Sequence, residues 1–399
     1  MPPVARPDHI RSHNLAVLLE HLHRYGEQTR AALTHSLGMS RSTIGALVGD
    51  LTALGLVEEI VPSGGAGVGR PSHYVVPHHR GPISFGVDLD PPAVVVAATG
   101  IGGSLLSRVE VALEGDVDRI APESVVEAIV RGVQLAWEQG RPEATPCGMG
   151  VSVPGTVDRR TGQIDDAPNL GWRDVDLRAL VAERLDPSLS ITLANDADLA
   201  LLAEHRRGSL RGCSDAVFIM GRRGVGAGIM TDGRALHGRS GHAGEIGHNT
   251  IDPGGPACHC GNRGCLEVYV GEAAMLALAD REEPVTRSAI ESLFADARAG
   301  TDSALVGVTG VVDPLARAIA ALHNTLSPER VVLGGSLAGV VELLPEQLTS
   351  AVAGYCFDLR GDPGLVAPEL GLDSALLGAA ELGFAGLLAD PLSYSDQAR

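Results

Sequence analysis

The chain has 399 residues, of which 44% are hydrophobic and 20% are charged, and its formal net charge is −18. This length exceeds what one ordinary hydrophobic core needs, so we expect two or three domains. Three of the six cysteines lie in one short cluster, which excludes a disulfide framework. The opening residues lack the pattern of a secretory signal and no apolar stretch reads as a membrane span, so we expect a cytoplasmic protein with no membrane partner.

Charge is unevenly distributed along the chain. Residues 1–80 hold seven arginines against six acidic residues, a net charge of +1, which leaves −19 for the remainder because the total is −18. A strongly negative surface repels a phosphate backbone. Only the N-terminal segment is therefore expected to approach nucleic acid.

Three helices are predicted in this N-terminal segment. Leucines from Leu15 to Leu22 recur at helical spacing, and Gly26 ends the pattern. Thr29 and Ser40 are suitable N-cap residues for two further helices. These three predicted helices indicate a helix-turn-helix. The expected helices cover residues 14–25, 29–37 and 40–54.

The third helix and the segment after it predict a winged helix that binds DNA. Short strands at 56–61 and 74–76 flank a glycine-rich loop, 63–72. The first turn of a recognition helix reads base edges, and an arginine at a wing tip can enter a minor groove. The residues expected to contact DNA are Ser40, Arg41, Ser42, Thr43 and Arg70. The alternative is a helical interaction domain that never meets DNA, because its charge is only weakly positive.

The larger part of the chain predicts a duplicated α/β unit. Three apolar runs separated by tight turns precede a helix, and the same order returns later in the chain. The first set covers 83–88, 93–99, 105–112 and the helix 122–138, and the second covers 216–220, 225–231, 234–236 and helices from Glu272 onward. Further strands at 148–153, 191–194 and 331–333 each run into a glycine or Asn-Asp turn, where α/β folds bind ligands. We therefore expect two lobes with the same architecture.

The expected domains divide the chain into three parts. They are a winged helix-turn-helix domain at 1–80, a first α/β lobe at 81–196 completed by a C-terminal helix at 374–389, and a second α/β lobe at 197–373 that holds the cysteine cluster and dimer contacts.

The cysteine cluster predicts a structural zinc site. Cys258, Cys260 and Cys265 follow His248 closely, and three thiolates with one imidazole are donors that tetrahedral Zn²⁺ prefers. A Cys-x-Cys pair is too tightly spaced to bridge to itself without strain, which disfavours a disulfide. His259 is the alternative fourth ligand, but it would crowd three consecutive donors onto one ion. The expected ligands are therefore His248, Cys258, Cys260 and Cys265.

With these motifs the chain resembles the ROK family, which includes repressors, uncharacterised proteins and sugar kinases on the actin-like, hexokinase-type fold. The resemblance covers almost the whole chain. Its marks are Glu245-Ile246-Gly247-His248, the run from Cys258 through Cys265 to Glu267, Asn195-Asp196 and the preceding winged helix. The family's kinases generally lack this winged helix, whereas its transcription regulators carry it.

The resemblance implies a sugar site. The positions that match the family's sugar-binding residues are Gly155, Asn169, Asn195, Asp196, Glu245, His248 and Glu267. Carboxylates and amides can bind adjacent hydroxyls in pairs, and His248 would contact both zinc and sugar through its two nitrogens. Taken alone, Asn195-Asp196 is more typical of a helix cap after a strand, and binding becomes the better interpretation because Glu245, His248 and Glu267 are also present.

The resemblance to kinases weakens at the nucleotide loops. Asp196 matches the kinases' general base, so phosphoryl transfer stays chemically possible. Where family kinases carry Asp-x-Gly-Gly-Thr, however, this chain reads Asp88-Leu89-Asp90-Pro91-Pro92, and proline has no amide proton to offer phosphate. The second loop puts Arg222-Arg223 where kinases have Gly-Thr, and Gly334-Gly335 suits either an adenosine loop or a strand-to-helix turn. We expect no ATP site and no catalytic residue.

These inferences predict a sugar-responsive transcription regulator, in particular a repressor of carbohydrate genes. Its expected partners are operator DNA with an inverted repeat, a sugar or sugar-phosphate effector, and a second copy of the chain in a homodimer or tetramer. The rival hypotheses are a sugar kinase that phosphorylates a hexose with ATP and carries an appended DNA-binding domain, and a scaffold that binds another protein.

Overall fold

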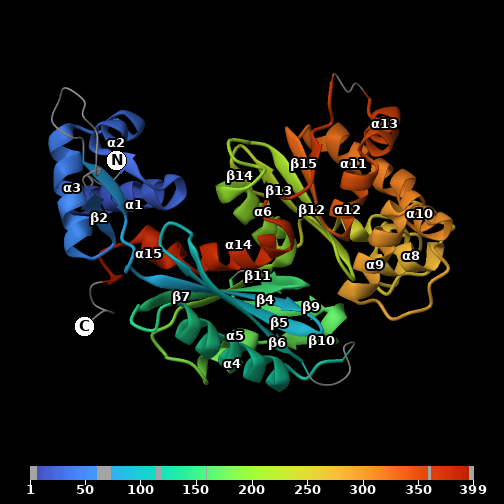
Figure 1. Ribbon diagram of the computed structural model, residues 1–399, viewed down its shortest axis with the longest axis horizontal. Coiled ribbons are helices and arrows are strands. Elements are labelled where there is room, and N and C mark those ends of the chain that lie inside the picture. Colours follow the sequence, from blue (N-terminus) through green and yellow to red (C-terminus); the bar gives the residue numbers. More distant parts are fainter. Residues whose placement is uncertain (1–6, 61–72, 114–118, 159, 358–360, 395–399) are drawn as a thin grey trace. The chain divides into compact units, whose positions relative to one another are not determined.

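The computed structural model describes residues 7–60, 73–113, 119–158, 160–357 and 361–394. The chain folds into two compact units, drawn in Figure 1. The first contains Met1–Ser152, Asp176–Leu193 and Ala379–Arg399, and the second contains Val153–Val175 and Ala194–Gly378. The first unit thus holds the expected DNA-binding segment together with most of the expected first lobe, while residues 153–175 of that lobe belong to the second unit.

Three helices and a small sheet form the N-terminal part of the first unit. They are α1 (Pro7–Tyr25), β1 (Gln28–Thr29), α2 (Arg30–Leu37), α3 (Arg41–Ala53), β2 (Val57–Ile60) and β3 (Tyr74–Pro77), with the sheet in the order β1-β3-β2. Thr29 Oγ1 accepts a hydrogen bond from Ala32 N, and Ser40 Oγ accepts one from Thr43 N, both at 3.1 Å. The capping predictions are confirmed, and the three helices agree with the predicted helix-turn-helix, while the glycine-rich loop expected as its wing, 63–72, lies outside the described residues.

Two details of this part differ from the sequence predictions. Helix α1 begins at Pro7 rather than near residue 14, because proline is favoured in the first turn of a helix although the leucine pattern starts only at Leu15. Strand β1 pairs antiparallel with β3 and adds a third strand to the expected hairpin. Two residues are too short to show a period-two pattern.

The core of the N-terminal part is completed by the C-terminal end of the chain. Leu15, Leu19 and Leu22 of α1 are fully buried, and they share one cluster with Phe384 and with residues of α15 (Ala385–Ala389). Figure 1 shows α15 beside α1. The structure therefore ends in two helices, α14 (Ser374–Gly383) and α15, where one helix at 374–389 was expected.

A buried polar group lies inside this junction. The amide of Gly102 donates to His23 Nδ1 at 3.0 Å, and His23 Nε2 lies 2.8 Å from Glu381 Oε2. Because Nδ1 accepts a hydrogen bond from the Gly102 amide, Nε2 carries the hydrogen that is donated to the carboxylate. Both His23 and Glu381 are almost wholly excluded from solvent. The junction thus joins α1, the turn at residues 101–104 and α14 through directional bonds.

Two five-stranded sheets with the same connectivity form the α/β units. The orders are β11-β7-β4-β5-β6 and β14-β13-β12-β15-β16. In each sheet an antiparallel meander is followed by a strand that returns parallel to the first strand of that meander. The duplication read from the sequence is confirmed. The strands are β4 (Ile83–Asp90), β5 (Ala93–Gly100), β6 (Leu105–Ala112), β7 (Pro146–Val153), β11 (Ile191–Asn195), β12 (Ala216–Gly221), β13 (Val225–Thr231), β14 (Arg234–Ala235), β15 (Arg330–Gly335) and β16 (Leu365–Val366).

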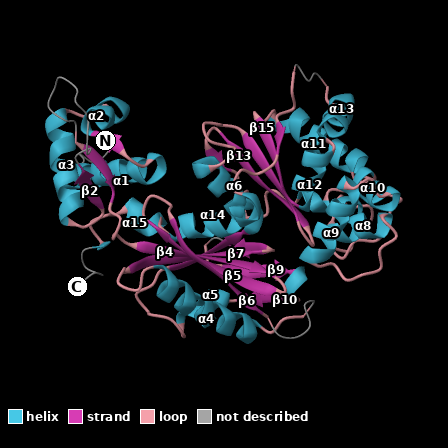
Figure 2. Ribbon diagram, in the orientation of Figure 1, coloured by secondary structure: helices cyan, strands magenta, loops and turns pink. Residues whose placement is uncertain are grey.

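Helices cover these sheets, as Figure 2 shows by colour. In the first unit, α4 (Pro122–Gly140) packs on β5 and β6, and α5 (Leu177–Ala182) lies beside α4. In the second unit, Val217 and Ile219 of β12 join one core cluster while Phe218 and Met220 join another, because successive side chains of a strand point to opposite faces. Helix α6 (Asp196–Arg207) covers the Phe218 face.

The other face of the second sheet is covered by a group of helices, and a small sheet precedes α6. The helices are α7 (Glu267–Val270), α8 (Glu272–Leu278), α9 (Arg287–Arg298), α10 (Asp302–Thr309), α11 (Val312–Leu326), α12 (Ser336–Leu343) and α13 (Pro345–Tyr355). The small sheet has the order β10-β9-β8 and consists of β8 (Thr156–Asp158), β9 (Gln163–Ala167) and β10 (Trp172–Val175). The short helices η1 (Pro168–Leu170), η2 (Ile246–His248) and η3 (Gly371–Asp373) lie in connections.

One helical stretch corrects the expectation that no apolar segment is long enough to span a membrane. Residues 302–326 are long and apolar enough to cross a membrane by length and composition alone. This stretch consists of α10 and α11, and Leu315 and Ile319 of α11 are fully buried in the larger core cluster. Core helices pass the same test, so the length of this stretch is weak evidence for a membrane span.

Candidate functional site

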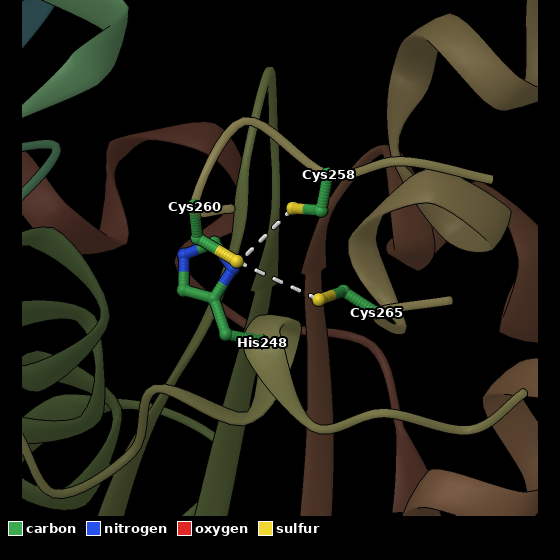
Figure 3. A group of neighbouring side chains, drawn as sticks. All are labelled: His248, Cys258, Cys260 and Cys265. Carbon is green, nitrogen blue, oxygen red and sulfur yellow. Dashed lines mark hydrogen bonds between the residues drawn. The ribbon is translucent and has the colours of Figure 1, made fainter. Parts of the chain in front are cut away.

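The cysteine cluster lies in two turns of the second unit. His248 ends η2, and the three cysteines follow it in a loop before α7 (Figure 3). The donor atoms of His248, Cys258, Cys260 and Cys265 all lie within 4.8 Å of one another. The structure therefore brings together the four residues predicted as metal ligands.

The distances within this group suit a tetrahedral metal ion better than a disulfide. Cys260 Sγ and Cys265 Sγ are 3.7 Å apart, and Cys258 Sγ is 3.7 Å from His248 Nδ1. Two sulfurs at about 2.3 Å from one tetrahedral ion are separated by about 3.8 Å, whereas a disulfide needs about 2.05 Å. His259 is not part of this four-donor group, and its Nδ1 lies 3.1 Å from Glu267 Oε1 and 3.9 Å from Cys258 Sγ.

The backbone of this loop depends on glycine. Gly261 and Gly264 have φ of 93° and 65°, the left-handed region that glycine adopts without steric cost. A Cβ on Gly264 would also lie 1.5 Å from the carbonyl oxygen of Asp252. In the absence of metal, burial raises the pKa of the Cys265 thiol to about 12, while the backbone amide of Asn262 lowers that of Cys260. Metal binding at this group would release protons.

The loop that carries Glu245 and His248 is seated on β13. The amide of Ala227 donates to the carbonyl of Gly244 at 2.8 Å. A Cβ on Gly244 would lie 1.8 Å from the oxygen of Ala227, and one on Gly247 would lie 2.1 Å from the oxygen of Val225. Only glycine permits this close approach. The two glycines therefore hold the backbone that carries Glu245 and His248 against β13.

Asn195 and Asp196 lie at the junction of β11 and α6. The Oδ1 atom of Asn195 accepts from the amides of Ala197 and Asp198, so Asn195 is the N-cap of α6. Its Nδ2 donates to the carbonyl of Gly155 at 3.1 Å. Asn195 can therefore cap α6 and also belong to the expected sugar site. Asp196 is buried at the start of the helix.

Glu267 is held from two directions. Its Oε2 accepts from the amide of Val225 at 3.0 Å, and its Oε1 faces His259. A Cβ on Gly224 would lie 2.9 Å from this Oε2 and 3.3 Å from Asn169 Nδ2, so Asn169 lies beside Glu267. The hairpin between β12 and β13 thus passes directly against two of the expected sugar-binding side chains.

Glu245 carries the clearest electrostatic signature of the site. Its pKa is raised chiefly because burial disfavours the charged carboxylate, and the nearby Glu267 and Asp198 raise it further while His248 and His242 oppose the shift. These interactions place Glu245, His248 and Glu267 in one neighbourhood. Perturbed carboxyl groups gather where ligands bind.

Two contacts of this neighbourhood were missed from the sequence. His237 Nδ1 lies 3.0 Å from Asp198 Oδ2, and Asp198 Oδ1 is buried without a hydrogen-bond partner among the described residues. His259 pairs with Glu267 and had been considered only as a metal ligand. Neither pair could be read from the sequence. His237 and Asp198, for example, are 39 residues apart in the chain.

The turns that match the kinases' nucleotide loops have packing roles. Pro91 and Pro92 form the β4–β5 turn between the paired residues Asp90 and Ala93, so neither turn residue offers an amide. Gly335 has a φ of 62° and caps α12, and its Cβ would lie 1.9 Å from the carbonyl of Gly221. This strand-to-helix turn requires glycine whether or not a nucleotide binds.

The residues expected to contact DNA lie at one end of α3. Ser40, Arg41 and Ser42 are exposed and Thr43 is partly exposed. Arg41 has no ion pair among the described residues, whereas Arg11 and Arg30 are paired with Asp50 and Glu59. Arg70 lies outside the described residues.

Comparison with known proteins agrees with this architecture. The ROK family domain matches residues 86–384. The xylose repressor of Bacillus spizizenii is 26% identical over 394 residues, which cover 94% of this chain and 97% of the repressor. A glucokinase of Thermotoga maritima is 31% identical over 313 residues, which cover 75% of this chain and 96% of the kinase.

A solved structure described as a ROK family transcriptional regulator, homolog of E. coli MLC protein, has the same fold. It superposes with a TM-score of 0.76 at 24% identity and covers 96% of this chain and 98% of its own. The family domain alone spans most of the chain. This chain therefore belongs to the ROK family.

Proposed function

We propose that the chain is a sugar-responsive transcription regulator, a repressor that binds operator DNA through its N-terminal winged helix. The observation that carries this proposal is the match to a repressor over 94% of the chain. Such a match must include most of residues 1–80, which lie before the family domain at residue 86. Within that segment, α3 presents an exposed first turn with Arg41, as a recognition helix requires.

The effector in this proposal binds in the second unit. Asn169, Asn195, Asp196, Glu245 and Glu267 supply amide and carboxylate groups, and His248 supplies an imidazole. Gly155 contributes its carbonyl, which already accepts from Asn195. A sugar hydroxyl both donates and accepts, so such a set can bind neighbouring hydroxyls.

Zinc is the metal that we propose for the four-donor group. The donor set of three thiolates and one imidazole, with separations of 3.7 Å, fits structural Zn²⁺. When bound, the ion would hold the loop between Glu245 and Glu267 in one conformation. His248 would direct Nδ1 to the ion, leaving Nε2 for a sugar hydroxyl.

Regulation requires that sugar prefer one of two arrangements of the protein. We propose a homodimer, with a tetramer as the larger alternative, in which this preference changes the spacing of two winged helices on an inverted repeat. Dimer contacts belong to the second lobe in this proposal. The whole complex acts in the cytoplasm, without a membrane partner.

A sugar kinase with an appended DNA-binding segment is the second candidate, favoured by Asp196 and by the 31% identical glucokinase. The Asp90-Pro91-Pro92 turn supports the regulator instead, because it lacks amides for phosphate and adds a negative charge. Sugar-dependent release of ADP from ATP distinguishes the two. We expect none above the rate without sugar.

The test of the proposed function is fluorescence anisotropy on labelled DNA from the region upstream of the protein's own gene. Salt is held fixed, because phosphate contacts make affinity strongly salt-dependent. D-xylose, D-glucose, N-acetylglucosamine and their phosphates are then titrated. Release or tightening by one of them supports the proposal, whereas DNA binding indifferent to all of them favours the scaffold. Absence of DNA binding overturns the regulator.

A further inference from the structure

His259 lies between the metal-binding group and the sugar pocket. Its neighbours in the chain are Cys258 and Cys260, and its Nδ1 lies 3.1 Å from Glu267 Oε1 and 3.9 Å from Cys258 Sγ. The ring of His259 meets that of His248 edge-on, with centroids 5.1 Å apart. One side chain therefore touches a proposed metal ligand and a proposed sugar ligand.

The contact with Glu267 is close. His259 Nδ1 lies 3.1 Å from Oε1, and the amide of Val225 lies 3.0 Å from Oε2. An ionised carboxylate is acceptor-only with about two lone pairs on each oxygen. These two contacts, one at each oxygen, hold the carboxylate from both sides and still leave a lone pair on each oxygen for a ligand hydroxyl.

The two side chains of this contact differ in their exposure to solvent. The Glu267 side chain is 12% exposed, whereas that of His259 is 46% exposed. A half-exposed histidine contributes little to a core, so packing does not account for its position. Apart from His259, the backbone amide of Val225 is what holds this carboxylate among the described residues.

We infer that His259 is a positioning residue for the effector site, which holds Glu267 in the orientation that receives sugar and ties that orientation to the metal-binding loop. This inference rests on the proposed function, because it assigns a role within the same pocket. His259 is not a metal ligand in this arrangement. Removing its imidazole leaves the four-donor group complete but frees one oxygen of Glu267.

The variants that test this role are His259→Ala, which removes the donor, and His259→Asn, whose Nδ2 can occupy the place of the imidazole Nδ1. Zinc content and sugar affinity are measured on the full chain, the latter by isothermal titration calorimetry with D-xylose, D-glucose and N-acetylglucosamine. We expect unchanged zinc in both variants. The alanine variant should bind the effector sugar roughly tenfold more weakly, and asparagine should restore most of the affinity.

A double-mutant cycle with Glu267→Gln separates positioning from a general structural effect. If His259 acts through Glu267, the alanine substitution should cause less than a twofold further loss in the Glu267→Gln background. An equal loss in both backgrounds, unchanged affinity in His259→Ala, or loss of zinc from it would overturn the inference alone. Failure of the wild-type protein to bind any sugar overturns the proposed function and this inference with it.

Discussion

Cys260 is the exposed cysteine of the metal-binding group, whereas Cys258 and Cys265 are buried. Three thiols in this narrow space repel one another once ionised, so a bound cation is needed to hold them together as thiolates. The residue types and their spacing predicted this group from sequence. Its distance from Glu267 could not be predicted, because that contact depends on where the loop turns back against β13.

Replacing Cys260 with alanine should release the metal and loosen the segment from Glu245 to Glu267. The physical reason is that three remaining donors bind structural zinc far less tightly than four. Metal analysis and hydrogen exchange of residues 245–267 check this, with Cys356→Ala as the matched control because Cys356 lies outside the group. Full zinc content with a normal sugar response in Cys260→Ala would contradict the prediction.

Glu245 should make sugar binding sensitive to mild acid. Burial raises its pKa, so the carboxylate that accepts sugar hydroxyls is present above that raised pKa and is lost as pH falls through it. The loss therefore begins at a higher pH than an ordinary glutamate would cause. Affinity measured between pH 7 and pH 4.5 checks this, with Glu245→Gln as control. An equally steep decline in the glutamine variant would assign the effect to another group.

At the scale of elements, the duplicated meanders and the capped helices of the N-terminal segment were predicted because their signals are local. Thr29 and Ser40 cap helices within their own turns. Strand β1 and the early start of α1 were missed, since the first depends on pairing with distant β3 and the second on polar residues without periodicity. The contacts of Glu204 could not be predicted either, because most of its partners are distant in the sequence. Its buried carboxylate accepts from Ser209, Ser374 and two amides at 369–370.

Helix α3 is the element whose surface should decide operator affinity. Arg41→Ala should weaken operator binding by about 1–3 kcal/mol if the guanidinium reads a base edge, while sugar affinity stays unchanged. Arg298→Ala is the matched control, since it removes an exposed arginine from α9 in the second unit. Anisotropy at fixed salt measures both. The same experiment applies to Arg70→Ala, and unaltered affinity in both variants would exclude the proposed DNA surface.

At the scale of the whole molecule, the N-terminal segment and the first α/β sheet meet in one unit through the buried His23–Glu381 pair. Substituting leucine for Glu381 would remove the carboxylate acceptor that lies 2.8 Å from His23 Nε2. We expect the free energy of unfolding to fall by about 1–3 kcal/mol. Glu381→Gln retains an acceptor oxygen and should cost less. Chemical denaturation checks the pair, and equal stability of the two variants would argue against this bond.

The packing of α15 against α1 also has a consequence for synthesis of the protein. The leucines of the first helix find their last apolar partners, Leu387 and Leu388, only near the end of the chain. During translation the N-terminal segment emerges first, yet its core stays incomplete until Leu387 and Leu388 have been made. A nascent chain that has not reached these residues would therefore leave the apolar side chains of α1 without their full set of partners.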